Sequence, residues 1–348
     1  MHIRLSSIVL CSLASLGTTQ NHVVSPPQYA KYEASAASDT PFAGLSRYQQ
    51  IHGELKGTAR TLLGIAWRRD GLFATNSMPG RNLDMELLCC NSSLASASAT
   101  FATNYLGSPT TVVTRKTIVS PDFSQIPDDT PAPWKFNLVF DAPFAYAGAS
   151  DLLYEVRIHG LSSGALYACD AASARDSSIT GPLNSVGLGC LTANGTMRLR
   201  ATFTTNTGAN TLSLGWAISN GPTAATAGLL IGLTNPNAYL PNLCNGNYLY
   251  TDGAVVGLIG ATDALGRWTL PTSTIAWNPA FAGAVLTAQA AAVDIGQGGL
   301  NVAASNGIRN EVAPGPQAFQ ITRVYAGTAT ATTGQVNVGY GLVTRFQY

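Results

Sequence analysis

The chain has few charged residues and no excess of either sign. Only 11% of its 348 residues are charged, with 19 Lys and Arg against 18 Asp and Glu, so the net charge is +1. Binding to nucleic acid through its phosphates needs a basic excess or stripe, so this balance excludes such a partner on bulk electrostatics. Disordered chains are charge-rich and poor in apolar residues. Hydrophobic residues make up 46% of this chain, which excludes a disordered protein.

Long apolar runs and phosphate-binding loops are also missing from the sequence. A membrane-spanning helix needs about 20 apolar residues, and the internal run 253–261 is shorter and interrupted by glycine. The glycine-rich motifs that cradle phosphates do not occur in the strand and helix contexts they require. We therefore expect no transmembrane helix and no nucleotide-binding loop.

The N-terminus is typical of a secretory signal. A short basic start precedes an apolar core from Leu5 to Leu16, which is too short to span a membrane. We therefore expect residues 1–20 to be a signal peptide and the protein to be exported, to the extracellular space or the cell envelope. Residues 21–44 are rich in Ser, Ala and Pro without periodicity, which predicts a flexible lead-in.

Five cysteines remain after the signal, and disulfides are their usual use in an exported protein. Cys190 and Cys244 both lie in the second half, and we predict that they pair. Cys89 and Cys90 are adjacent on an expected strand and point to opposite faces. One of them could reach Cys169; we take Cys90–Cys169 as the possible second disulfide, and the choice between the two neighbours stays open.

Helical periodicity is nearly absent, and apolar residues alternate with polar ones instead. Such alternation occurs at 63–67, 83–87, 136–140 and 154–158, and each run is bounded by Gly, Pro, Asn or Asp. This pattern is typical of half-buried antiparallel strands. The sequence therefore predicts an all-β fold.

Changes in composition predict two antiparallel β-sandwich domains of jelly-roll or immunoglobulin-like type. Residues 45–170 form the first, the small polar segment 171–185 is a linker, and residues 186–316 form the second. The last thirty residues predict a hairpin whose arginine and aromatic content matches the first half. We therefore expect 317–348 to return to the first sandwich, with the second inserted before it.

Seven segments together carry a family resemblance over most of the mature chain. They are FAGLSRYQQIHGELKGTARTLLGIAWRRDG (42–71), FDAPFAYAGASDLLYEVRIHG (140–160), GLGC (187–190), LPNLCNGNYLYTDG (240–253), the stretch around DALGRWTLP (263–271) with LTAQAAAVD (286–294), and ATTGQVNVGYGLVTRF (331–346). In these segments the chain resembles uncharacterised exported β-sandwich proteins that planctomycete-type bacteria carry in many paralogous copies. The motifs are structural, so the resemblance implies no catalytic residue.

Each candidate catalytic group has a simpler structural interpretation. The Gly-x-Ser-x-Gly motif at 160–164 would need a strand, a sharp turn and a helix, but a strand-like run follows it, which favours a hairpin turn. His52 and His159 adjoin glycines at strand ends and are favoured as structural histidines. Asp84 and Glu86 share one strand face, which favours a solvated face over an acid/base pair. We therefore assign no catalytic residue.

The best candidate for a ligand or metal site is the acidic, proline-rich loop 120–133. Asp122, Asp128 and Asp129 offer the hard oxygen ligands that Ca²⁺ prefers, although their spacing is not that of an EF-hand. Trp134 follows the loop and could stack on a sugar ring. A solvated loop is the alternative.

Taken together, the sequence favours an exported, non-catalytic protein of the cell surface or envelope matrix, or an adhesion protein. Cell-surface polysaccharide or other envelope proteins are the expected partners, and self-association is open. The first alternative is an extracellular carbohydrate-binding protein or hydrolase, with a cleft where two carboxylates, or Ser and His, converge. The second is an outer-membrane β-barrel, suggested by apolar alternation from Tyr340 to Tyr348, which the closing strand of a soluble sandwich also explains.

Overall fold

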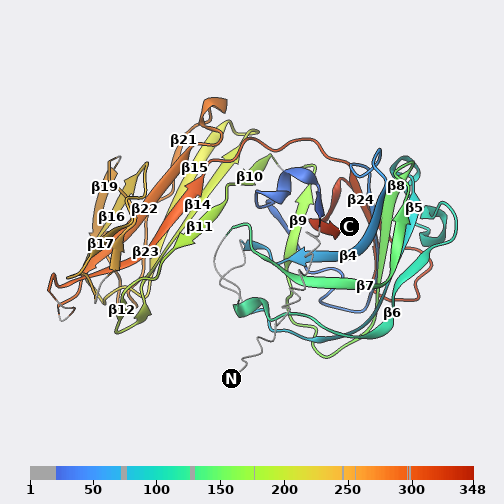
Figure 1. Cartoon of the computed structure of the whole chain (residues 1–348), viewed down its shortest axis with the longest axis horizontal. Helices are drawn as coiled ribbons and strands as arrows, with labels where there is room; N and C mark the ends of the chain where they lie inside the picture. The colour runs from blue at the N-terminus through green and yellow to red at the C-terminus, as the bar shows by residue number, and fades with distance from the viewer. Residues whose placement is uncertain are drawn as a thin grey trace, which may run out of the picture.

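The chain is all-β and is built from antiparallel sheets, as its alternating pattern predicts. The structure is a computed structural model that describes residues 21–71, 77–125, 130–175, 177–244, 247–254, 256–295, 297 and 299–348. Figure 1 shows the sheets gathered into two groups, which we call the first lobe (21–175 and 317–348) and the second lobe (177–316). Among the residues described, no helix has the length and apolar character needed to cross a bilayer.

Three sheets make up the first lobe. Its strands are β1 (His22–Ser25), β2 (Ala36–Ser38), β3 (Ser46–His52), β4 (Arg60–Arg68), β5 (Asn82–Ser92), β6 (Thr110–Val119), β7 (Trp134–Tyr146), β8 (Asp151–Leu161), β9 (Cys169–Ser173), β24 (Ile321–Ala326), β25 (Gln335–Val338), β26 (Tyr340–Leu342) and β27 (Thr344–Gln347). They pair in the orders β25-β24-β3-β8-β5-β6, β1-β27-β4-β7 and β2-β9-β26. Single 3-10 turns lie between them: η1 (Pro27–Ala30), η3 (Leu94–Ser96), η4 (Phe101–Asn104) and η5 (Phe123–Gln125).

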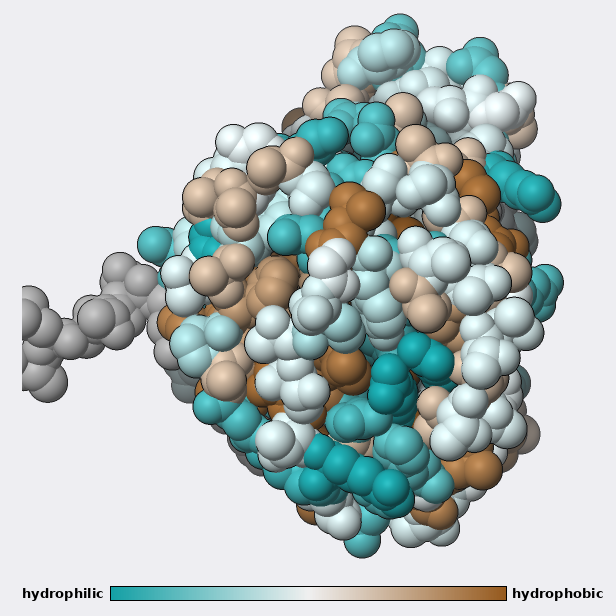
Figure 2. Space-filling model, turned by 90° about the vertical axis from the view of Figure 1, so that its right-hand side faces the viewer, coloured by the Kyte–Doolittle hydropathy of each residue, from teal (hydrophilic) through white to brown (hydrophobic). Residues whose placement is uncertain are grey.

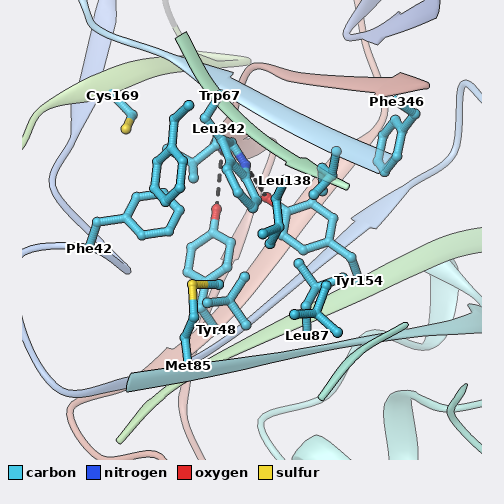
Figure 3. Packing of buried hydrophobic residues seen from close by; sticks show 14 of the residues in the cluster. Phe42, Tyr48, Trp67, Met85, Leu87, Leu138, Tyr154, Cys169, Leu342 and Phe346 are labelled. Carbon is cyan, nitrogen blue, oxygen red and sulfur yellow. Dashed lines mark hydrogen bonds between the residues drawn. The ribbon is translucent and has the colours of Figure 1, made fainter. Parts of the chain in front are cut away.

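Aromatic side chains fill the core between the six-stranded and four-stranded sheets. Along β7, Phe136, Leu138 and Phe140 are buried and the residues between them are exposed, as period-two alternation requires. Trp67 of β4 donates a hydrogen bond from Nε1 to the Tyr154 hydroxyl of β8 over 3.4 Å, which joins the two sheets inside the core (Figure 3). Each buried aromatic ring removes a large apolar area from water, so these rings contribute strongly to the stability of this lobe.

The second lobe has two larger sheets and two short hairpins. Its strands are β10 (Ser178–Thr180), β11 (Leu183–Val186), β12 (Leu191–Thr192), β13 (Gly195–Thr196), β14 (Arg198–Asn206), β15 (Thr211–Ser219), β16 (Thr226–Gly232), β17 (Ala238–Leu240), β18 (Asn247–Leu249), β19 (Val256–Ala261), β20 (Trp268–Thr269), β21 (Ser273–Ala276), β22 (Val285–Val293) and β23 (Val302–Glu311), with the 3-10 turn η6 (Pro279–Phe281). One sheet has the order β11-β23-β22-β16-β19, and the other has β10-β14-β15-β20 with β21 also on β15.

Small residues dominate the core of the second lobe. Ala288, Ala290 and Ala292 alternate along β22 and are almost completely buried. They pack in one cluster with Phe203 and Trp216 of the opposite sheet, whose rings meet edge to face at 5.1 Å. Alanine on one side lets the two sheets approach closely around a few large rings.

The chain end returns to the first lobe. β24 forms an antiparallel hairpin with β25 and also pairs with β3. β27 lies between β1 and β4, with His22 opposite Gln347. The two ends of the described chain therefore lie side by side in one sheet.

Two segments predicted to lack regular structure form strands instead. Within 21–44, predicted as a flexible lead-in, β1 and β2 pair with β27 and β9, and Tyr29 is completely buried. Within 171–185, predicted as a linker, β9, β10 and β11 pair with strands of both lobes. Both segments are small and polar, and strand pairing with distant residues overrides their weak local preference. The predicted signal peptide, 1–20, lies outside the described residues.

Candidate binding site

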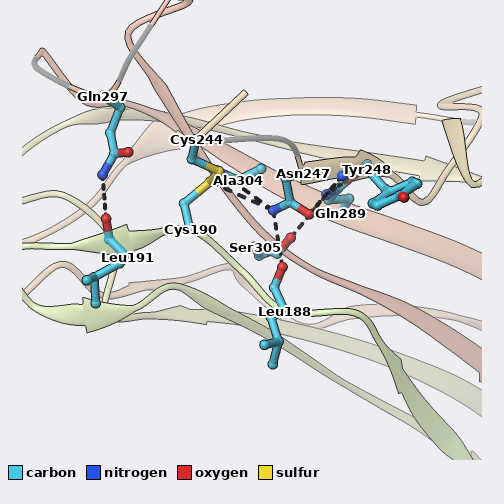
Figure 4. Close-up of a disulfide and its surroundings, with 10 residues drawn as sticks. All are labelled: Leu188, Cys190, Leu191, Cys244, Asn247, Tyr248, Gln289, Gln297, Ala304 and Ser305. Atoms are coloured by element: carbon cyan, nitrogen blue, oxygen red, sulfur yellow. Dashed lines mark hydrogen bonds between the residues drawn. A yellow bond between two sulfur atoms is a disulfide. The ribbon is translucent and has the colours of Figure 1, made fainter. Parts of the chain in front are cut away.

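The disulfide predicted between Cys190 and Cys244 is present, and it closes a loop with a sequence separation of 54. Cys190 precedes β12, and Cys244 lies between β17 and β18 (Figure 4). The bond therefore fastens to the rest of the lobe a segment that we call the disulfide arm, the described residues 233–244 and 247–253.

Hydrogen bonds hold the disulfide arm on the face of β22 that points away from the core. Gln289 lies between two core alanines, so its side chain projects to that outer face. Its Nε2 donates to Tyr248 O over 2.9 Å, and its Oε1 accepts from Tyr250 N over 3.0 Å. Gly307 of β23 lies beneath Tyr250, where a Cβ would be 2.2 Å from the tyrosine Cβ. Glycine at that position is what allows the arm to lie flat on the sheet.

Three tyrosines form a row along the disulfide arm. The ring of Tyr248 lies 5.4 Å from that of Tyr239 and 6.1 Å from that of Tyr250. Tyr239 is 56% exposed and Tyr248 37% exposed, whereas Tyr250 is buried. Burial, and then Tyr248, raise the pKa of Tyr250, so its phenol keeps its proton at neutral pH. The inner ring supports the two outer ones, which present aromatic surface to solvent.

A cleft of about 560 Å³ opens between the disulfide arm and β12. Its lining consists of uncharged residues: Leu188, Gly189, Cys190, Leu191, Cys244, Asn247, Tyr248, Tyr250 and Gln297. Asn247 donates from Nδ2 to Leu188 O over 3.1 Å, and Gln297 donates from Nε2 to Leu191 O. Asn247 Nδ2 also contacts the sulfurs of Cys244 and Cys190 at 3.7 Å and 3.8 Å. A side-chain amide has two N–H groups, so the second N–H of Gln297 is the donor offered to a ligand. The cleft therefore suits a neutral polar ligand with one apolar face.

The predicted calcium loop is described only in part. Asp122 is exposed, and its Oδ1 accepts a hydrogen bond from Ser124 N over 2.8 Å, so it caps its own turn. Asp128 and Asp129 lie outside the described residues. A search of the described side chains finds no group of three or more His, Cys, Asp or Glu placed to hold a metal ion.

Trp134 begins β7 but is no open platform. The guanidinium carbons of Arg68 and Arg345 lie 4.9 Å and 5.2 Å from the centre of its ring. The side chain is half-buried. These cation–π contacts occupy aromatic surface that a sugar would need, which is a correction to its predicted role.

The possible Cys90–Cys169 disulfide is not formed, and Cys89, Cys90 and Cys169 are free and buried. Cys90 packs with Ile51 and Leu153 on the outer side of the six-stranded sheet. Cys89 and Cys169 belong to the core on the inner side. Adjacent strand residues do face opposite sides, as predicted, and that alternation keeps Cys90 away from Cys169.

Carboxylates on the outer face of the six-stranded sheet are held by arginines. Glu155 is fully buried and accepts from Arg47 Nε over 3.0 Å and from Arg157. Arg157 also donates from Nη1 to Glu86 Oε1 over 3.0 Å, and His159 Nε2 lies 3.2 Å from the same Glu86 oxygen. Neighbouring strands are thus joined by ion pairs across their registers. Figure 2 shows this side of the molecule, where hydrophobic residues occur as separate spots among polar ones.

His52 has the surroundings of a structural histidine. Its Nδ1 lies 2.6 Å from the hydroxyl of Ser25, which donates to Glu54 over 2.9 Å. The ring is fully buried and stacks on Tyr154 at 5.5 Å. Burial lowers the pKa of His52 to about 3, so the ring is neutral and ties β1 to β3.

A second buried ionic cluster lies where β2, β4 and β9 meet. Arg68 donates from Nη2 to Asp170 over 2.5 Å, and both side chains are completely buried. Glu33 is buried nearby and accepts from Gly71 N over 2.7 Å. Burial, and then Asp170, raise the pKa of Glu33 well above its ordinary value. Arg68 therefore faces both Asp170 and Glu33, and Glu33 holds its proton most readily.

Sequence reasoning found the disulfide but missed the cleft beside it. A signal was available in 240–253, which gathers three Asn and two Tyr around Cys244 with only one charged residue. Comparison with known proteins adds no further assignment, because no family model, curated protein or solved structure matches this chain.

Proposed function

We propose that this is an exported, non-catalytic protein of the cell surface or envelope matrix, which adheres to a neutral polysaccharide through the cleft beside the Cys190–Cys244 disulfide. One observation carries the proposal: the partly exposed ring of Tyr248, with the exposed ring of Tyr239 packed against it, stands beside side-chain amides in an uncharged cleft. A sugar ring has C–H groups on its faces and hydroxyls on its rim. Tyrosine faces suit the former, and amide donors and acceptors suit the latter.

Export is supported by the signal-like residues 1–20 and by the disulfide, since disulfides persist in oxidising compartments. The resemblance to exported planctomycete-type proteins agrees with this proposal. In the proposed arrangement, the first lobe supports the second lobe, and the second lobe presents the ligand site.

We also propose that each lobe is a β-sandwich domain of jelly-roll or immunoglobulin-like type, with the second inserted into the first. Two hydrophobic clusters support this, one drawing on β3–β9 with β26 and β27 and the other on β11–β23. A domain is expected to have its own core.

The test measures binding of neutral and acidic polysaccharides by affinity electrophoresis and calorimetry. We expect binding to a neutral polysaccharide, with affinity at least about tenfold lower for Tyr248→Ala, a loss of about 1.4 kcal/mol. The matched control is Tyr325→Ala, which removes a half-buried tyrosine of the first lobe.

Two outcomes would contradict the proposal. One is binding that Tyr248→Ala and Tyr325→Ala weaken equally. The other is a protein that binds no neutral polysaccharide, or that hydrolyses one.

A further inference from the structure

The outer edge of the second lobe has an open strand. β19 ends the sheet order β11-β23-β22-β16-β19 and pairs only with β16 among the described strands. Figure 1 places β19 on the side of the second lobe that points away from the first. The backbone groups on its free side therefore form an unfilled row of donors and acceptors.

The second sheet ends on the same side of the lobe. Gly260 of β19 packs on Trp268 of β20, so closely that a Cβ would lie 2.4 Å from the indole ring. Trp268 and the adjoining β21 pair with β15 at the end of their own sheet. The two sheet edges therefore stack into one surface, which we call the outer edge.

Apolar side chains are exposed along the outer edge. Ile259 of β19 is 84% exposed, and Leu230, Leu258 and Ile275 lie between 38% and 43%. Leu230 and Ile259 project from the outer face of the sheet, since Leu229 and Ile231 of β16 are buried and Gly228 is the cross-strand partner of Ile259. Exposed apolar surface that continues along an open strand is typical of an interface.

Charged residues that protect an open edge are present on the first-lobe edge strand β6 and missing here. β6, an edge strand of the first lobe, carries Arg115 and Lys116. β19 has the sequence VGLIGA, without charge or proline, and 211–293 contains only three charged residues. Lysine and proline on an edge strand prevent pairing with another chain. The outer edge therefore lacks the features that would keep it unpaired.

We propose that the outer edge joins two copies of this chain, with β19 pairing antiparallel to β19 of the second copy. An antiparallel pair of identical strands obeys a two-fold axis, which is the commonest symmetry of protein dimers. An uncharged edge meets itself without the like-charge repulsion that a charged edge would suffer. The pairing makes one continuous sheet from two second lobes and shields both copies of Ile259.

The strength of this association follows from the size of the strand. β19 has six residues, so the contact is smaller than the interface of a tight complex. We expect a reversible dimer with a dissociation constant of about 1–100 μM. Paired cleft-bearing lobes would bind a repeating polymer more tightly than one lobe alone.

Sedimentation velocity of the purified protein over a range of concentrations tests the proposal. We expect dimerisation by the wild type and at least about tenfold weaker association for Ile259→Lys, which places a charge on the edge without emptying the core. The matched control is Val338→Lys on the first-lobe edge strand β25; Val338 is 76% exposed, and its variant should associate like the wild type.

Hydrogen exchange locates the contact in the same samples. Amides of 256–261 should gain protection as the protein concentration rises, and circular dichroism should show that Ile259→Lys keeps the wild-type fold. A wild type that stays monomeric up to about 100 μM overturns the proposal. So does a dimer that Ile259→Lys leaves intact, or one whose β19 amides gain no protection.

Discussion

The two lobes have the same kind of sheet but use different side chains to hold it together. The first lobe packs large aromatic rings, buries the Arg68–Asp170 ion pair and places Glu155 among arginines. The second lobe packs alanines around a few rings, has eight charged residues in 177–316, and is closed by a disulfide. The second lobe is therefore held partly by a covalent bond, whereas the first lobe is held by buried polar networks.

The difference shows what each lobe can give to function. In the first lobe, buried ion pairs join neighbouring strands. The second lobe keeps uncharged surface at both its cleft and its outer edge. Contacts with neutral partners are therefore expected there.

The largest effect should come from breaking the buried ion pair of the first lobe. Arg68→Met leaves Asp170 and Glu33 buried without their cation, and we expect a loss of about 3–5 kcal/mol of unfolding free energy. Hydrogen exchange in urea should show the loss at β4 and leave β22 unchanged. Arg115→Met, which removes an exposed partner of Asp84, is the control and should change little. Equal effects of the two variants would contradict this assignment.

The next effect should come from opening the disulfide of the second lobe. Replacing both Cys190 and Cys244 by alanine frees a long loop in the unfolded chain, and we expect a loss of about 2–4 kcal/mol. The loss should appear at β22 and not at β4 in the same exchange experiment. Binding to the neutral polysaccharide should weaken as well, because the disulfide arm forms one wall of the cleft. A variant as stable as the wild type would show that hydrogen bonds alone hold the arm.

A pH-dependent effect, which is small near neutral pH, should come from His52. Its folded pKa of about 3 lies below the ordinary value of about 6.5, so the unfolded state binds the extra proton between these values. Stability from this group is therefore full above pH ~6.5 and falls by up to about 1.4 kcal/mol per pH unit as pH decreases toward ~3. His52→Gln should lose less stability than the wild type over that range in urea titrations. Parallel pH profiles would contradict the neutral, buried state of His52.

The smallest effect should be that of calcium on the first-lobe loop. Asp122 already caps its own turn, so we expect Ca²⁺ to bind weakly, if at all. Calorimetric titration should show no micromolar site, and Asp122→Asn should leave the thermogram unchanged. Micromolar affinity that Asp122→Asn abolishes would restore the loop as a metal site.

Alternation in the sequence was enough to predict many of the strands, but not all of them and not their partners. Phe136, Leu138 and Phe140 reveal a buried face because their alternation with polar residues is the same whichever strands lie beside β7. The strands in 21–44 and 171–185 have no such pattern, and they exist because distant strands supply their hydrogen bonds. Long-range pairing of this kind leaves no local trace in a sequence.

The candidate site was likewise predictable only in part. The partners Cys190 and Cys244 were predictable because few cysteines lie in the second half. The cleft itself depends on Gln289 and Gly307, which receive the disulfide arm from far along the chain. Trp134 looked available because nothing in the sequence shows that Arg68 and Arg345 would lie over its ring.

The return of the chain end has a consequence for the order of folding. β3 gains its neighbour β24 only after the whole of the second lobe has been synthesised, because β24 begins at Ile321. A second lobe that folds first brings the ends of the long connection together and lowers the entropy cost of completing the first lobe. Slow formation of the second-lobe disulfide would therefore delay the maturation of the first lobe, although no cysteine pair holds that lobe together among its described residues.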